Sequence, residues 1–384
     1  MGQALDQQGD SDRIYAVVEN GEITAKSEGV SASWCRSLGE HKVDPDNPRA
    51  PWVLTEAELK DASGPVEELI GIARQENDRL YSIVGKVGYV VMLTSPDGVV
   101  VDFRGDPARS RDFAYWGVWK GGVWSEAVEG TNGIGTCIAE LRPVTVHRTQ
   151  HFRARNGSLS CCGAPIFDPG GELAAVLDVS SIDPEISERS HSLALAVTID
   201  SARAVEESLF RSSFRQAWTL AIAAPSADGR ALMLAVDADQ RIVGADRTAR
   251  RTLGIDSALL AAGASLWTFF ERSLSFFRAR NASTAVLLRR IGEHEPWPAL
   301  SAPPETDARG TPLPASAALP RTDAPLSPRE QSILDFIGRG QTNKEIARLL
   351  GISPETVKSH VKNMFWKLGV ERRAQAIRRA KDFG

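Results

Sequence analysis

The C-terminal segment, residues 326–380, constrains the fold of this chain more than any other stretch, because its polar residues mark the starts of short helices. Two capping boxes, Ser327 with Glu330 and Thr342 with Glu345, each stand before apolar residues at helical spacing. Glycines end the first run and form a short turn after the second, and a Ser-Pro pair then opens a third helix. Capped helices that meet at a Gly-containing turn predict a helix-turn-helix.

The third predicted helix, residues 354–368, has two chemically different faces. Apolar residues recur at i, i+4, i+7 and i+11, while lysines and small polar residues occupy the opposite side. A helix that packs an apolar stripe on its neighbours and presents cations outward suits the major groove of DNA. A solvated face on an ordinary helical bundle is the alternative. On the second helix, Ile346, Leu349 and Leu350 are expected to face the interior.

The segment resembles the LuxR/GerE-type (NarL-like) DNA-binding domain in its L-S-P-R-E opening, its N-K-E-I-A run at 343–347 and its T-V-K-S-H-V run at 356–361. The resemblance implies an all-α domain of four helices whose partner is double-stranded DNA. It implies that some outward side chains face base edges while others hold phosphates, which supply affinity and register. The predicted DNA-binding residues are Lys344, Thr356, Lys358, Ser359, Lys362, Asn363 and Lys367.

Charge is unevenly distributed along the 384 residues. Residues 326–384 contain twelve Lys or Arg and six Asp or Glu, so they carry a surplus of six positive charges, and the rest of a chain of net charge −4 carries −10. This distribution suits a protein of which one part meets nucleic acid. No apolar run is long enough to span a bilayer and the N-terminus is unlike a signal peptide, so a cytoplasmic protein without a membrane partner is expected.

Between residues 81 and 205 the hydrophobic pattern changes to the short apolar runs and hairpin turns expected of strands. Amphipathic runs at 56–81 and 184–214 predict a helix on either side of the strands. Strands with hairpin turns, flanked by helices, predict an α+β sensor domain. The predicted strands are 88–94, 99–103, 144–146, 158–167 and 173–180.

This region is similar to the GAF domain of AcoR-type activators, which regulate acetoin, glycerol and related small-alcohol metabolism. The motifs that carry the similarity are N-G-I-G-T-C at 132–137, P-I-F-D at 165–168 and L-D-V-S at 177–180, with S-W-C-R at 33–36 upstream. The resemblance implies a ligand-sensing domain. The chain departs from that family in one respect: no G-x-x-x-x-G-K-[ST] motif is present, so ATP-driven promoter opening is not expected.

Aromatic and polar residues in the same region are candidates for a small-ligand pocket. The alternative is that the aromatic residues are core and that the glycine run is only a tight loop. No cofactor is expected, and His151 lacks a second ligand at metal spacing. The resemblance makes a short-chain alcohol, diol or ketone the expected effector. The candidate ligand-binding residues are Trp116, Trp119, Trp124, Asn132, Thr136, His151 and Cys161.

Cysteine chemistry offers two further interpretations. Cys137, Cys161 and Cys162 could form a thiol switch, or the reductase site that some free methionine-sulfoxide reductases build on this fold. Adjacent cysteines in one strand point to opposite faces, however, and buried cysteine is usually an inert apolar residue. A thiol-based redox regulator and a GAF-fold reductase with a DNA-binding tail therefore remain alternatives.

The sequence thus predicts a multidomain α+β chain that is not an enzyme but a one-component transcription regulator. Residues 231–254 resemble the opening of a PAS domain, and Pro, Ala, Ser and Thr dominate the segment after 296. A homodimer that recruits or blocks RNA polymerase is the expected form. The predicted order is an N-terminal helical region (1–80), a GAF domain (81–205), a signalling helix (193–222), a short PAS-like α+β unit (230–292), a flexible linker (293–325) and the LuxR-type domain (326–384).

Overall fold

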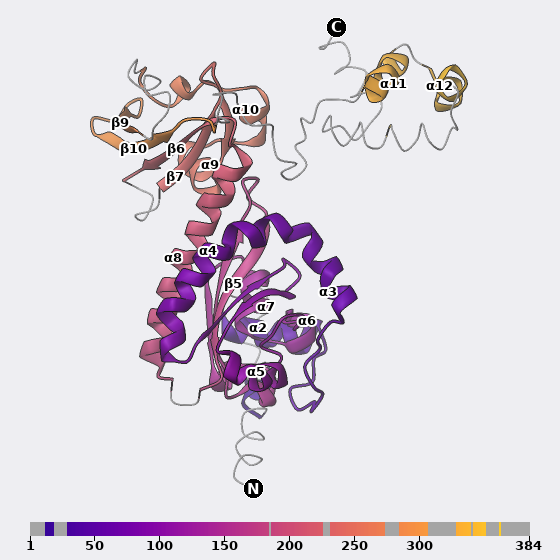
Figure 1. Ribbon diagram of the computed structural model, residues 1–384, viewed down its shortest axis with the longest axis vertical. Helices are drawn as coiled ribbons and strands as arrows, with labels where there is room; N and C mark the ends of the chain where they lie inside the picture. The colour runs from indigo at the N-terminus through magenta and orange to yellow at the C-terminus, as the bar shows by residue number, and fades with distance from the viewer. Residues whose placement is uncertain are drawn as a thin grey trace. The chain divides into compact units, whose positions relative to one another are not determined.

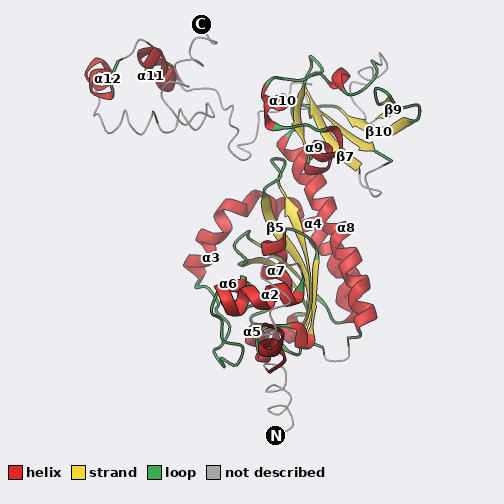
Figure 2. Cartoon of the chain, turned by 180° about the vertical axis from the view of Figure 1, so that it is seen from behind, coloured by secondary structure: helices red, strands yellow, loops and turns green. Residues whose placement is uncertain are grey.

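The computed structural model describes residues 12–18, 29–183, 186–225, 231–272, 284–305, 328–338, 341–350 and 361. The chain divides into two compact units, Met1–Leu313 and Pro314–Gly384. The first unit is mixed α/β and contains two five-stranded antiparallel sheets (Figures 1 and 2). The predicted combination of helices with antiparallel strands is confirmed.

The first sheet has the strand order β2-β1-β5-β4-β3. The turns after β1 and β4 contain the Pro-Asp-Gly and Asp-Pro-Gly-Gly sequences that predicted hairpins. All five predicted strands are present, with their ends within one or two residues of the expected positions. They are β1 (Val90–Thr94), β2 (Val100–Arg104), β3 (Val144–His147), β4 (Ser160–Phe167) and β5 (Leu173–Ser181).

Both faces of this sheet are covered. Helices α4 (Glu67–Val84) and α8 (Glu188–Ser213) pack on the face that carries Val91 and Leu93. Val90 and Met92 point to the opposite face and pack in one cluster with Phe113 and Ile134. The shorter helices lie on that side of the sheet (Figure 2). We call that opposite side the α7 face. Its helices are α2 (Val30–Cys35), α5 (Ser110–Trp116), α6 (Glu126–Glu129) and α7 (Gly133–Glu140).

The amphipathic run predicted as one helix at 56–81 is two helices. α3 (Glu56–Ser63) ends at Gly64, and a 3-10 turn, Gly64–Val66, separates it from α4. Pro65 causes the break, because proline has no N–H to donate and its ring would clash with the preceding turn of a continuous helix. The predicted position of the apolar residues is nevertheless confirmed, since α4 buries its apolar face on the sheet.

The second sheet has the order β8-β7-β6-β10-β9, with β6 at its centre. β6 begins a few residues after α8 ends, so residues 218–222, which were predicted as the end of a signalling helix, are a strand instead. The predicted strand pair and helix at 231–254 are confirmed as β7, β8 and α9. The elements are β6 (Trp218–Ala223), β7 (Ala231–Val236), β8 (Ile242–Ala245), β9 (Thr284–Arg289), β10 (Pro296–Ala302), α9 (Arg247–Leu253) and α10 (Ser257–Ala261).

Strand β10 overturns the predicted start of the linker. Its sequence, Pro-Trp-Pro-Ala-Leu-Ser-Ala, has the composition expected of a flexible linker. The strand nevertheless pairs with both β6 and β9. The pairing with β6 covers only residues 299–302, so both prolines lie where no β6 backbone needs their missing N–H. Trp297 between them is only 1% exposed and packs in the core of this sheet. Burial of one large aromatic side chain outweighs the unfavourable composition.

Two helices of the second unit are described. α11 (Pro328–Gly338) and α12 (Asn343–Leu350) confirm the first two predicted helices of the C-terminal segment. On α12 the buried side chains are Ile346 and Ala347, whereas Leu349 is 57% exposed, so the prediction of Leu349 as an interior residue is wrong. Leu349 lies three residues after Ile346, at the margin of the apolar stripe, where spacing alone does not decide burial.

Candidate functional site

A buried ion-pair network joins α2 to α6 and α7. Arg36 follows α2 and makes two contacts with Glu126 of α6, Nε to Oε2 and Nη2 to Oε1, both at 2.9 Å. Its Nη2 also lies 3.3 Å from Oε1 of Glu140 at the end of α7. Ser33 donates to Glu126 Oε1 at 2.5 Å. The S-W-C-R motif thus connects α2 to both α6 and α7 through charge-assisted hydrogen bonds.

Asn132 opens α7 and has no capacity left for a ligand. Its Oδ1 accepts from the backbone N–H groups of Ile134 (3.0 Å) and Gly135 (2.8 Å), which makes it the helix cap. Its Nδ2 donates to the carbonyls of Trp124 (2.9 Å) and Gly130 (2.8 Å). The glycine run is therefore the start of a helix and not a loop. A Cβ at Gly135 would lie 2.6 Å from the carbonyl oxygen of Trp124, so only glycine allows this approach.

Thr136 is also engaged within the protein. It is fully buried, and its Oγ1 lies 3.0 Å from Ser33 Oγ of α2. The backbone N–H of Asn132 donates to the same Oγ1 at 3.4 Å. The structure therefore brings two of the predicted ligand residues, Asn132 and Thr136, into the framework that positions α7.

The predicted aromatic residues form much of the apolar packing of the α7 face. Trp124 is buried and donates from Nε1 to the Gly117 carbonyl at 2.9 Å. Trp119 packs on Phe103 with ring centroids 4.4 Å apart, and Trp116 is partly buried in the same cluster. These contacts match the core interpretation of the aromatic residues. They also form an apolar wall on the α7 face, beside the polar residues His151, Cys161 and Asp178.

His151 and Cys161 form a hydrogen-bonded pair on the α7 face. His151 Nδ1 lies 2.9 Å from the carbonyl oxygen of Arg148, which can only accept, so Nδ1 carries the proton. Nε2 is then an acceptor, and the Cys161 thiol donates to it at 3.2 Å. Burial lowers the pKa of His151 to about 4, so the ring is neutral at physiological pH. The structure thus brings these two predicted residues together.

Asp178 lies beside them in the middle of β5, and sequence analysis gave it no role. It is fully buried, and Ser180 donates to its Oδ2 at 2.5 Å. Its Oδ1 has no hydrogen-bond partner. Burial raises the pKa of this carboxyl group to about 7. The sequence contained one indication, because Asp178 is the one charged residue inside the apolar run 173–179. We call His151, Cys161, Asp178 and Ser180 the Asp178 cluster.

Cys162 points to the other side of the sheet, as the strand alternation predicted. Its Sγ lies 3.3 Å from Nδ1 of His191 on α8, and burial lowers the pKa of His191 to about 4. All four cysteines are buried, and burial raises the pKa of each thiol. A protonated thiol is a poor nucleophile, which disfavours the redox and reductase alternatives. Within the described ranges, no group of His, Cys, Asp or Glu has the arrangement of a metal site.

The predicted DNA-binding residues fall mostly outside the described ranges. The backbone of Lys344 lies in the first turn of α12. The capping box that opens this helix is present, with Thr342 N donating to Glu345 Oε2 at 2.7 Å and Glu345 N to Thr342 Oγ1 at 3.4 Å. Residue 361 is helical, as predicted for the third helix. Thr356, Lys358, Ser359, Lys362, Asn363 and Lys367 lie outside the described residues.

Two family models match this chain, one in its N-terminal half and one at its C-terminus. Residues 324–380 match the model of bacterial regulatory proteins of the LuxR family. The C-terminal segment is a LuxR-family regulatory domain. Residues 15–203 match the model of the N-terminal domain of MimR. The predicted LuxR-type domain at the C-terminus and the predicted resemblance of the N-terminal region to AcoR-type activators are confirmed.

Three curated relatives are each similar to part of this chain. The acetoin catabolism regulatory protein of Cupriavidus necator is 33% identical over 227 residues, 58% of this chain and 34% of the relative. The propane 2-monooxygenase operon transcriptional activator MimR of Mycolicibacterium smegmatis is 34% identical over 149 residues, 38% of this chain and 24% of the relative. The transcriptional regulatory protein MctR of Rhizobium johnstonii is 50% identical over 60 residues, 16% of this chain and 28% of the relative. The matches therefore span about a third or less of each relative.

Among solved structures, the DhaR(N)–DhaL complex of Escherichia coli has a chain that matches at 13% identity with a TM-score of 0.42, covering 72% of this chain and 99% of that one. In the described part of the chain, no helix is both long enough and apolar enough to cross a membrane.

Proposed function

We propose that this LuxR-type chain is a one-component regulator in which a small neutral molecule, bound at the α7 face of the first sheet, controls DNA binding by the C-terminal domain. The observation that carries the proposal is the pairing of a MimR-type N-terminal domain with a LuxR-family domain on one chain. The first sheet with its helices is the proposed GAF domain, and the second sheet is the proposed PAS-like unit. The active form is a homodimer that acts on RNA polymerase without its own ATPase.

The Asp178 cluster supplies the polar part of the proposed effector site. A carboxyl group with a pKa of about 7 is partly protonated at physiological pH, so it can both donate and accept a hydrogen bond. Its unpartnered Oδ1 favours a ligand that brings one hydroxyl or carbonyl oxygen into an otherwise apolar wall. Relatives named for acetoin catabolism and a propane monooxygenase operon support a short-chain alcohol, diol or ketone as effector.

Entry of an effector requires α7 to move, because the side chains of the cluster are buried. α7 is tied to α2 by the contact of Arg36 with Glu140 and rests on β4 and β5, and the opposite face of these strands packs on α8. α8 leads within a few residues to β6, the central strand of the second sheet. A shift of α7 is thereby transmitted toward the second sheet through packed elements.

Effector binding is expected to stabilise the full-length chain in a thermal-shift assay with acetoin, 2,3-butanediol, 2-propanol and acetone. A ligand at a hundredfold excess over its Kd adds about 2.7 kcal/mol of stability, which raises the melting temperature by roughly 5 °C or more. Asp178→Val should abolish the shift without unfolding the protein, because it replaces a buried carboxyl group by a β-branched apolar residue, which strands favour. Asp200→Ala, at an exposed position on α8, should keep it. An equal shift in the Asp178→Val variant would place the effector elsewhere.

The DNA-binding prediction concerns two lysines of the third helix predicted from the sequence, both outside the described residues. Replacing Lys358 and Lys362 together by alanine should weaken binding of the full chain to double-stranded DNA by about 100-fold and reduce the salt dependence, since two cations would no longer meet phosphates or base edges. Fluorescence anisotropy with labelled duplex at two salt concentrations measures both. The matched control, Lys60→Ala with Lys86→Ala, removes the same charge from exposed positions of the first unit. Unchanged affinity in the first variant would contradict the assignment.

A further inference from the structure

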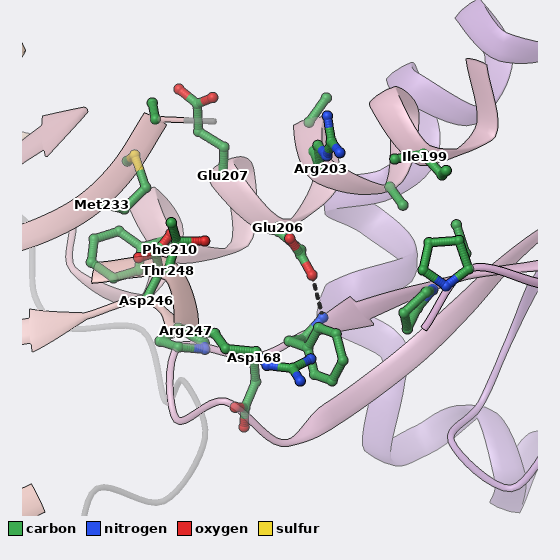
Figure 3. Close-up of a pocket in the computed structure, with 18 of the residues that line it drawn as sticks. Asp168, Ile199, Arg203, Glu206, Glu207, Phe210, Met233, Asp246, Arg247 and Thr248 are labelled. Atoms are coloured by element: carbon green, nitrogen blue, oxygen red, sulfur yellow. Dashed lines mark hydrogen bonds between the residues drawn. The ribbon is translucent and has the colours of Figure 1, made fainter. Parts of the chain in front are cut away.

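A cleft lies between the two sheets of the first unit, away from the Asp178 cluster. It has a volume of about 530 Å³, within the range of small-molecule sites. Its walls come from α8, the end of β4 with the following turn, the start of β7, and α9 (Figure 3). Part of its lining is apolar, with Ile199, Phe210 and Met233 among the residues that bound it. The cleft is thus large enough for a ligand with an apolar body.

Charged residues in the cleft are mostly satisfied by the protein itself. Five acidic side chains line it, and each has a partner. Asp200 contacts Arg203 at 3.3 Å, and Glu206 accepts from the backbone N–H of Phe167 at 2.8 Å, as the dashed line in Figure 3 marks. The remaining three are Glu207, which pairs with Arg211, Asp246, which caps α9, and Asp168, which accepts from the N–H of Glu172.

Two of the four lining arginines have no acidic partner within the described residues. Arg142 pairs with Glu140 and Arg203 with Asp200. Arg247 and Arg251 stand four residues apart on α9, so they lie on one face of that helix and both border the cleft. They place two positive charges on the α9 side of the cleft, while Asp168, Glu206 and Asp246, which accept from backbone N–H groups, keep their negative charges.

Arg247, an exposed residue, stacks on an aromatic ring. Its guanidinium carbon lies 4.2 Å from the centroid of the Phe167 ring, which belongs to β4 of the first sheet. Stacking of this kind uses the flat face of the guanidinium and leaves its edge N–H groups available as a planar fork, the geometry that matches a carboxylate. A stacked arginine also loses less rotamer freedom when it binds an anion.

We propose that this cleft is a second ligand site, specific for a monocarboxylate with an apolar body. Arg247 holds the carboxylate, Arg251 adds a second positive charge, and the apolar body lies against Phe210 and Met233. The site is separate from the proposed effector site, so either can exist without the other. Because Arg247 lies on α9, which packs on the second sheet, and Phe167 belongs to the first sheet, a ligand here would contact both parts.

Isothermal titration calorimetry of the full-length chain with benzoate tests the proposal, with benzyl alcohol as a ligand of the same ring without the charge. Benzoate should bind with a stoichiometry near one, and benzyl alcohol at least about tenfold more weakly. Arg247→Gln combined with Arg251→Gln should weaken benzoate by at least about tenfold. Arg241→Gln removes an exposed arginine outside the cleft lining and should leave the affinity unchanged, as should Asp178→Val.

Several results would overturn the proposal. They are no binding of benzoate at millimolar concentration, equal binding of benzyl alcohol, or undiminished affinity in the double variant while its unfolding curve matches the wild type. Inorganic phosphate that displaces benzoate at equal concentration would also overturn it, since the cleft would then attract any anion without regard to an apolar body.

Discussion

Replacing Arg36 by alanine is expected to destabilise the first unit by about 3–5 kcal/mol, because it removes the arginine partner of the buried Glu126 carboxylate and one of the two arginines that contact Glu140. The side chains of Glu126 and Glu140 are only 4% and 5% exposed, and Arg36 contacts both. The desolvation of these acids is compensated in the folded protein largely by that guanidinium. Urea denaturation of the full chain, followed by tryptophan fluorescence, should show a lower midpoint for Arg36→Ala than for the wild type.

A second arginine provides the control. Arg79 contacts Glu76 at 2.6 Å, but its side chain is 51% exposed, so water can replace the ion pair. Arg79→Ala should cost less than about 1 kcal/mol. If both variants lost the same stability, the buried network would not be what fastens α2 to α6 and α7. Arg36→Lys should recover only part of the loss, since one ammonium cannot reproduce the two-pronged contact with Glu126.

The strands of the first sheet were predictable from local sequence because each is a short apolar run ended by a turn. Pro96-Asp97-Gly98 and Asp168-Pro169-Gly170 determine where two hairpins reverse, so hydrophobic pattern and turn chemistry agree. Likewise, Thr342 and Glu345 predicted the start of α12 through a capping interaction that involves only neighbours in sequence. Local interactions of this kind can be recognised without knowledge of the fold.

The remaining features depend on residues far apart in the sequence. β10 forms because Trp297 fills the core of the second sheet, although prolines flank it. Arg36 meets Glu126 across 90 positions, and nothing near either residue specifies the other. Asn132 looked available for a ligand because its saturation by Trp124 and Gly130 carbonyls depends on how the chain folds back. The candidate site was therefore located in the right region, but the role of each residue required the fold.

The ionisation of Asp178 is expected to make the free energy of unfolding depend strongly on pH. Its carboxyl group titrates near 3.8 when unfolded and at about 7 in the folded protein, because burial disfavours the charged form. Between these values the folded state binds more protons than the unfolded state, so stability falls as pH rises and levels off above pH 7. The full difference corresponds to roughly 4 kcal/mol. Asp178→Asn removes this titration with little change of shape.

The measurement is the difference in unfolding free energy between Asp178→Asn and the wild type, from urea denaturation at pH 5, 6, 7 and 8. The difference should move in favour of the variant by roughly 1.4 kcal/mol per pH unit up to pH 7 and then stay constant. His151 and His191 oppose this trend in the wild type below pH 6.5, because their lowered pKa values make protonation costly, but they are present in both proteins and cancel in the difference. Asp200→Asn, at an exposed position, should give a flat curve. A flat curve for Asp178→Asn as well would mean that the buried carboxyl group is ionised without cost, and Asp178 could then not act as a donor to an alcohol or ketone.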